Sequence, residues 1–278
     1  MAEVIARGLR FHVQRLGHGQ PAVLFLHGVV MDNLSSWYFS VAPAVAEVAP
    51  VLLYDLRGHG RSERPPDGYG VADMVADLEA VLDAVGVDRP LHIVGNSFGG
   101  LLALAFALAH PDRVASLVLV DAHVSDEGFG QQMAATLKLQ GEARLAAIAE
   151  HFSDWLGRHS ERKRNRLAST ARALVEGTSL VADLQASVPF DRAALGSLPH
   201  PVLAIYGEHS DIRHRGEDLA ATLPRCELRI LPGCSHSVLW EATAEVRAAV
   251  VAWIRARTEA EHQPGEDRPC GSCSSSRP

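Results

Sequence analysis

A short glycine-flanked segment around Ser97 has the residue types that nucleophilic chemistry needs. The sequence Gly95-Asn96-Ser97-Phe98-Gly99 lies between a short apolar run and a very apolar stretch. In such a strand–turn–helix segment the serine takes a strained conformation that projects its hydroxyl, and the glycines keep neighbouring backbone clear of it. The pattern predicts that Ser97 is a nucleophile. It also predicts that the N–H of Phe98, at a helix start, stabilises an oxyanion.

Strands and helices alternate on both sides of this segment. We expect a pair of short strands within residues 3–15, and buried strands at four apolar runs: 22–26, 51–54, 91–95 and 114–120. Apolar residues at helical spacing predict helices over three ranges: 36–47, 69–86 and 98–110. This alternation is typical of βαβ units and predicts an α/β fold with a largely parallel sheet.

The alternation stops after Asp121, which divides the chain into regions. Helical periodicity without a strand fills the next segment, and strands return at 201–206 and 227–231 before a helix over 242–257. We therefore expect the domain ranges 1–124 and 200–258 for the core, 125–199 for a helical cap, and 259–278 for a disordered tail. The tail contains Cys270 and Cys273 at a C-x-x-C spacing without a second pair, so we expect no metal there.

These motifs make the chain similar to members of the α/β-hydrolase fold superfamily, over about residues 4–257. The resemblance is to its small, cofactor-free esterase, C–C hydrolase and thioesterase branches. Four blocks carry it: His27-Gly28, residues 55–62, residues 95–100, and the late segments with Asp211 and His236. It implies a mostly parallel sheet flanked by helices, a helical cap after the sixth strand, and no cofactor or metal.

A serine hydroxyl needs a base, and the base needs a third group that fixes its tautomer. In this fold the chain order is serine, acid, histidine. His236 lies between the last expected strand and the last expected helix, in a loop from which it could reach Ser97. We therefore predict that His236 is the base.

The acid is predicted to be Asp211, which follows the strand over 202–206. The commoner pattern in the family has an aspartate at the position of Ser210, and a variant with Ser-Asp there resembles the present sequence. Glu208 is one alternative. Asp121 is another, because it follows the sixth strand, where some members of the family have their acid.

By the same resemblance, the backbone N–H of Val29 is the second oxyanion donor. His27 and the loop over 55–62 are expected to be structural. Apolar side chains near these loops and in the cap are candidates for the substrate pocket: Met31, Trp37, Phe129, Met133, Trp155 and Val238. They predict a pocket for an apolar acyl or aromatic group.

Composition excludes several other classes of function. The chain has 278 residues, 47% of them hydrophobic and 21% charged, which is typical of a folded domain. A net charge of -7 gives no basic footprint for nucleic acid or anionic membrane, and no apolar run is long enough to span a bilayer. The start has no secretory signal, and the four cysteines suit no disulfide framework, so we expect a cytoplasmic protein.

The sequence thus predicts a serine hydrolase that acts on a small, largely apolar ester, thioester or activated C–C bond. Its partner would be a small-molecule acyl or carbonyl substrate, and the oligomeric state is left open. A C–C bond hydrolase of the meta-cleavage type, an enol-lactonase and an acyltransferase are alternatives with the same triad. A ligand-binding receptor of this fold without catalytic activity is an alternative of another class, which an intact Ser–acid–His set disfavours.

Overall fold

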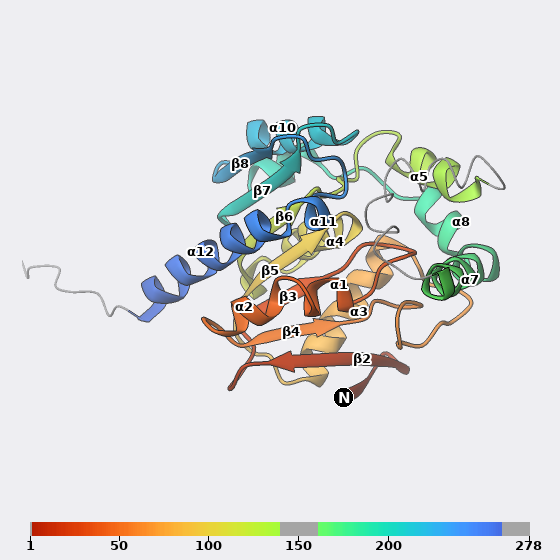
Figure 1. Cartoon of the computed structure of the whole chain (residues 1–278), viewed down its shortest axis with the longest axis horizontal. Coiled ribbons are helices and arrows are strands. Elements are labelled where there is room, and N and C mark those ends of the chain that lie inside the picture. Colours follow the sequence, from red (N-terminus) through yellow and green to blue (C-terminus); the bar gives the residue numbers. More distant parts are fainter. Residues whose placement is uncertain (1, 140–160, 263–278) are drawn as a thin grey trace, which may run out of the picture.

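The central feature of the computed structural model is an eight-stranded sheet with helices on both faces (Figure 1). The structure describes residues 2–139 and 161–262. The strands are β1 (Ala2–Ala6), β2 (Leu9–Leu16), β3 (Val23–Leu26), β4 (Val51–Tyr54), β5 (Leu91–Asn96), β6 (Val114–Val120), β7 (Val202–Gly207) and β8 (Cys226–Leu231). Their order is β1-β2-β4-β3-β5-β6-β7-β8. β2 pairs antiparallel with β1 and β4, and the remaining pairs are parallel. The mostly parallel sheet expected from the sequence is confirmed.

Two apolar clusters, one on each face of the sheet, hold the helices in place. The helices are α1 (Ser35–Tyr38), α2 (Ala42–Ala46), α3 (Val71–Ala84), α4 (Phe98–Ala109), α5 (Phe129–Lys138), α7 (Glu161–Gly177), α8 (Leu180–Gln185), α9 (Arg192–Gly196), α10 (Arg213–Thr222), α11 (Val238–Glu241) and α12 (Thr243–His262). Along β3, Leu24 and Leu26 join the cluster under α3 and α4, while Val23 and Phe25 join the cluster under α1, α2 and α12. Successive residues of a strand face opposite sides, so a strand buried on both faces is a continuous apolar run.

The helices differ from the expected ones in three places. The helix expected over 36–47 is two short helices, α1 and α2, and the second has a proline in its first turn. The sequence did not reveal the short helix α11. Helix α12 continues to His262, so residues 259–262 belong to it and not to the expected tail.

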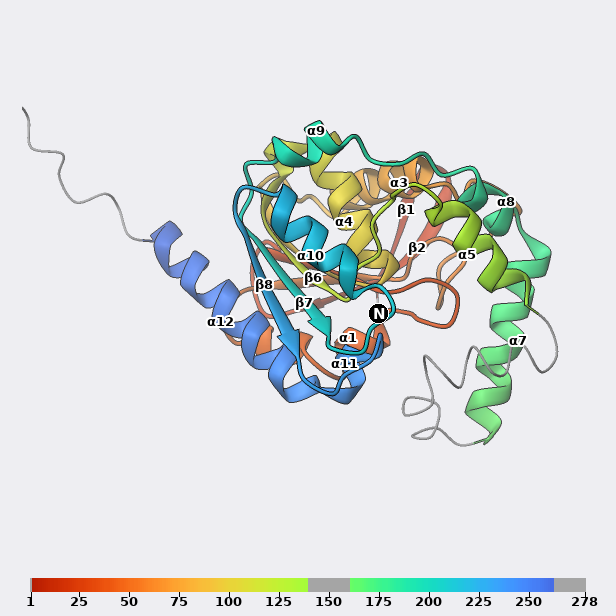
Figure 2. The same ribbon diagram turned by 90° about the horizontal axis from the view of Figure 1, so that it is seen from above.

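The segment between β6 and β7 contributes α5, α7 and α8, which lie together at one side of the sheet (Figure 2). The chain leaves and returns through a narrow neck, where the N–H of Phe190 donates to the carbonyl of Ser125 at 2.6 Å. α5 and α8 approach closely because Gly130 has no side chain to strike the carbonyl of Leu184. α9, by contrast, contacts the core helix α10. The part of the segment that stands apart from the sheet therefore ends before Arg192.

Two further properties concern membrane-spanning helices and the cysteines. Within the described ranges, none of the helices combines the length and the apolar character needed to cross a bilayer. Cys226 and Cys234 are free thiols, and Cys270 and Cys273 lie outside the described residues. The cytoplasmic setting stays a prediction.

Candidate active site

Ser97 occupies a sharp turn between β5 and α4, where its backbone has φ 51° and ψ −120°. A positive φ is costly for a residue other than glycine, so the surroundings must hold it. The N–H of Ser97 donates to the carbonyl of Val120 at 3.0 Å, which ties the turn to the end of β6. A Cβ on Gly95 would strike the carbonyl of Gly99, and a Cβ on Gly99 would strike that of Leu26. The flanking glycines therefore allow the turn, as the sequence predicts.

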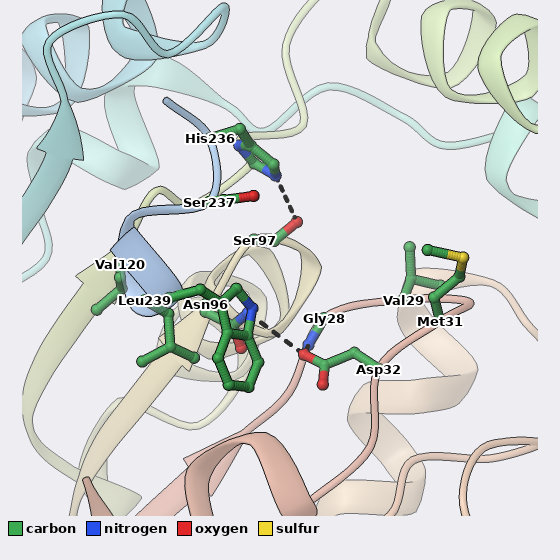
Figure 3. A pocket seen from close by; sticks show the side chains of 11 residues that line it. Gly28, Val29, Met31, Asp32, Asn96, Ser97, Val120, His236, Ser237 and Leu239 are labelled. Carbon is green, nitrogen blue, oxygen red and sulfur yellow. Dashed lines mark hydrogen bonds between the residues drawn. The ribbon is translucent and has the colours of Figure 1, made fainter. Parts of the chain in front are cut away.

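His236 lies in the loop after β8 and connects Ser97 to a carboxylate. Its Nε2 is 3.1 Å from the Oγ of Ser97, and its Nδ1 is 3.0 Å from Oδ1 of Asp121 (Figure 3 shows the first contact). A carboxylate can only accept, so the hydrogen of the neutral ring is on Nδ1. Nε2 then has the lone pair that accepts the hydroxyl hydrogen of Ser97, which is the arrangement that a general base requires.

Asp121 follows β6 directly, and a dense set of donors fixes its carboxylate. The side chain of this residue is 2% exposed. Its Oδ2 accepts from the N–H of Gly207 at 2.8 Å, and its Oδ1 accepts from the hydroxyl of Ser210 at 2.5 Å as well as from His236. These donors hold the carboxylate in the orientation in which it faces His236.

The prediction that Asp211 holds His236 is wrong, because the carboxylate hydrogen-bonded to Nδ1 belongs to Asp121. β6 and β7 are neighbouring parallel strands, so the residues after both strands lie near the same histidine. At the end of β7 it is the hydroxyl of Ser210 that turns inward, toward Asp121, while Asp211 is exposed. The other alternative, Glu208, accepts instead from the N–H of Gly233 at 2.9 Å.

The environment of His236 changes its basicity in two opposing ways. Burial lowers the pKa of the imidazole, but the hydrogen bond and the negative charge of Asp121 outweigh burial and raise the pKa above its ordinary value. The charge of Asp211 adds to the rise in the pKa of His236, and that of Arg215 opposes it. Asp211 thus raises the pKa of His236 through its charge, without a hydrogen bond to the ring.

The ring of His27 connects the loop after β3 to the loop after β4 by two hydrogen bonds. The Nε2 of His27 accepts from the N–H of Leu56 at 3.0 Å, so Nδ1 has the hydrogen and donates to the carbonyl of Gly28 at 2.6 Å. In a trans peptide the N–H points opposite to the carbonyl. The N–H of Val29, in the same peptide plane, therefore points away from His27.

His59 fixes the next peptide of this loop. Its Nε2 accepts from the N–H of Val30 at 2.8 Å, and its Nδ1 donates to the carbonyl of Arg57 at 2.7 Å. Val30 has φ 71°, a conformation that a β-branched residue rarely adopts without such support. Burial, helped by the nearby His27 and opposed by the bond to Arg57, lowers the pKa of His59 to about 3.

This lowered pKa predicts a pH-dependent contribution of His59 to stability. Between about pH 6.5 and pH 3 the unfolded chain binds a proton at this residue and the folded protein does not. The free energy of unfolding should therefore fall on acidification through this window, by up to about 1.4 kcal/mol per pH unit from this residue. Urea unfolding of the wild type and of His59→Gln, which can still accept from Val30, should show a shallower fall in the variant. Equal slopes would contradict the assignment.

One pocket opens beside Ser97, between the loops that follow β3, β5 and β8 (Figure 3). Its lining residues are Gly28, Val29, Met31, Asp32, Asn96, Ser97, Val120, His236, Ser237, Leu239 and Trp240. Met31 lines the pocket, as the sequence predicts, and Val29, the predicted oxyanion donor, lies beside it. The sequence did not predict that Asp32, Asn96 and Trp240 line the pocket. For Asp32 there was one signal in the sequence, a charged residue four positions after Gly28.

Two candidate pocket residues belong to the core of the protein. Trp37 is fully buried, donates from Nε1 to the carbonyl of Leu26 at 2.9 Å and packs on Phe25 with ring centroids 5.1 Å apart. Val238 is fully buried in the same cluster, while Leu239 and Trp240 beside it line the pocket. The prediction that Trp37 and Val238 line the pocket is therefore wrong.

The candidates from the expected cap also fall elsewhere. Phe129 is buried under the guanidinium of Arg215, whose central carbon lies 5.8 Å from the ring centroid. Phe129 and Met133 both belong to the apolar cluster under α3 and α4. These contacts attach α5 to the core, and neither residue is among those that line the pocket beside Ser97. Trp155 lies outside the described residues.

Comparison with known proteins agrees with this architecture. A model of the α/β hydrolase fold family matches residues 21–243. A putative carbamate hydrolase from Caulobacter segnis is 32% identical over 78% of this chain and 85% of its own length. A 2-hydroxymuconate semialdehyde hydrolase from a Pseudomonas species is 30% identical over 89% of this chain and 91% of its own.

A solved structure of a meta-cleavage product hydrolase from Pseudomonas fluorescens superposes with a TM-score of 0.78 at 23% identity, covering 94% of this chain and 98% of that one. This likeness supports the fold. The family match and the two relatives together lead to one conclusion: the chain belongs to the α/β hydrolase fold family and is an enzyme of that family.

Proposed function

We propose that the protein is a serine hydrolase in which Ser97, His236 and Asp121 act as nucleophile, base and orienting acid. The observation that supports this most directly is the chain of two hydrogen bonds, 3.1 Å and 3.0 Å long, through the ring of His236. A histidine without a catalytic role is not expected to be hydrogen-bonded to a strained serine on one side and to a buried carboxylate on the other.

The reaction follows from the donors and acceptors. Ser97 Oγ attacks the carbonyl carbon of the substrate while its proton passes to Nε2 of His236, and Asp121 stabilises the resulting imidazolium. The N–H groups of Val29 and Phe98 stabilise the oxyanion; Phe98 begins α4, so its N–H has no acceptor within the helix. His236 then gives the proton to the leaving group, and water releases the acyl group by the same steps.

The proposed substrates are small molecules with a carboxylic ester, a thioester or an activated C–C bond. The relatives named as a carbamate hydrolase and a 2-hydroxymuconate semialdehyde hydrolase add carbamates and ring-cleavage products to the candidates. A screen of acyl esters, acyl-thioesters, carbamates and ring-cleavage diketones would rank these classes by kcat/KM.

Labelling with a fluorophosphonate probe tests the proposal against a ligand-binding role. An activated serine forms a covalent bond to phosphorus, so mass spectrometry of the digested wild type should place the adduct on Ser97. Ser97→Ala should remain unlabelled at the same probe concentration. Tight binding of a small molecule by a wild type that the probe does not modify would favour the receptor instead.

A further inference from the structure

We propose that Asp32 makes this hydrolase select by charge: a substrate with a cationic group beside its reacting carbonyl is preferred to a neutral one, and an anionic one is disfavoured. The proposal rests on the proposed function, because it assumes that Ser97 is the nucleophile. It names the substrate class that the pocket would accept, which neither the motifs nor the apolar candidates indicate.

Asp32 lies close to the nucleophile, on the opposite side of it from His236 (Figure 3). The position that a Cβ of Gly28 would occupy is 3.2 Å from Oδ2 of Asp32 and 3.6 Å from Cβ of Ser97. The carboxylate and the serine thus flank the same point of the loop after β3. A group attached to the reacting carbonyl and directed into this pocket would come close to the negative charge.

The groups bonded to this carboxylate leave its charge in place. Oδ2 accepts from the N–H of Gly28 at 2.8 Å and from Nδ2 of Asn96 at 3.3 Å, and Oδ1 accepts from the N–H of Asn33 at 2.8 Å. All three donors are neutral. Among the described residues that line the pocket there is no arginine or lysine. With His236 in the neutral form that acts as base, a substrate entering the pocket therefore meets a net negative charge.

The remaining wall of the pocket suits a cation as well. Trp240 and Leu239 line it together with Asp32, so an aromatic side chain and a carboxylate share the same cavity. An aromatic ring and a carboxylate on one small cavity are the chemistry that holds quaternary ammonium groups. An anionic group would lose its hydration there and gain no opposite charge.

Three p-nitrophenyl esters with one chain length test the selection. Their butyryl chains end in trimethylammonium, tert-butyl or sulfonate, so size is nearly constant while charge changes. For the wild type we expect kcat/KM to fall in that order, by about tenfold between the cationic and neutral esters and again between the neutral and anionic ones. Raising the salt concentration should reduce both ratios.

Asp32→Asn keeps the size of the side chain and an oxygen that can accept from Gly28. In this variant the ratio of kcat/KM for the cationic and anionic esters should fall at least about tenfold. Asp211→Asn is the matched control: it removes the same charge from an exposed position, and any effect through His236 acts equally on all three esters, so the ratio should stay within about twofold of the wild type. Thermal unfolding and fluorophosphonate labelling check that the variants are folded and that Ser97 is reactive.

Each outcome supports or overturns the selection. Hydrolysis that depends on Ser97 but runs at equal rates with all three esters, or fastest with the sulfonate, would overturn the charge selection and leave the serine mechanism standing. An Asp32→Asn variant that keeps the wild-type ratio of kcat/KM for the cationic and anionic esters would likewise overturn the charge selection and leave the serine mechanism standing. If Asp32→Asn does not fold, the order of the wild-type rates and their response to salt still distinguish charge selection from its absence. If the wild type neither turns over any ester nor reacts with the probe, the proposed function itself fails.

Discussion

Replacing Ser97 with alanine should lower kcat about 10⁵- to 10⁶-fold on the best substrate found in the screen. The nucleophile, base and acid act as one unit, so removal of the attacking oxygen leaves only the contribution of the oxyanion donors and of substrate binding. The fold should survive, since alanine fits where serine does and the positive φ of residue 97 is held by the same backbone bonds. Initial rates at saturating substrate measure the loss, and thermal unfolding checks the fold.

Ser237→Ala is the matched control for this experiment. Ser237 also lines the pocket and directly follows His236, but its hydroxyl lies outside the two hydrogen bonds that join Ser97 to Asp121. We expect it to keep kcat within about tenfold of the wild type. A folded Ser97→Ala variant that retains more than about one hundredth of the wild-type kcat would show that another group attacks the substrate.

The positions of Ser97 and His236 were predictable because local patterns determine them. The glycines at 95 and 99, between an apolar strand and an apolar helix, leave few other conformations for the turn. His236 lies in the loop that ends the last strand of the sheet, and a parallel sheet brings such loops to one edge. The same reasoning predicted the sheet itself, since buried parallel strands are continuous apolar runs.

The acid was not predictable, because two neighbouring strands offer one at the same edge. Asp121 after β6 and Asp211 after β7 are equally compatible with the chain pattern. The difference is one side-chain direction: Ser210 turns inward and donates to Asp121, and the next residue is exposed. A hydrogen bond between residues so far apart in the sequence has no local signature.

Most of the residues that line the pocket could not be predicted, for a different reason. Buried core residues and pocket residues are both apolar, so composition alone cannot separate Trp37, which packs on Phe25, from Trp240, which lines the cavity. Asp32 was not predicted because the family resemblance gives a role to the backbone N–H of Val29 and none to the side chains of this loop. Its carboxylate nevertheless bonds the N–H of Gly28, and so supports the loop as well as giving the pocket its charge.

The choice between the two aspartates is testable with one pair of variants. Asp121→Asn should lower kcat about 10⁴-fold, because an amide can donate to Nδ1 of His236 and stabilise the wrong tautomer of the ring. It should also change the pH profile. His236 must be neutral to act as base, so kcat/KM of the wild type falls as the pH drops through the raised pKa of this residue. Without the charge of Asp121, burial dominates and this acid limb should move to lower pH.

Asp211→Asn should behave differently, since Asp211 contributes only its charge to His236. We expect kcat to change by no more than a few fold, with a smaller displacement of the acid limb in the same direction. Rates measured from about pH 5 to about pH 9 for the wild type and both variants decide the question. A large loss in Asp211→Asn together with a mild one in Asp121→Asn would reverse the assignment, because it would require the exposed carboxylate to replace the buried one during turnover. The buried site of Asp121, with donors from Gly207, Ser210 and His236, makes the first outcome the expected one.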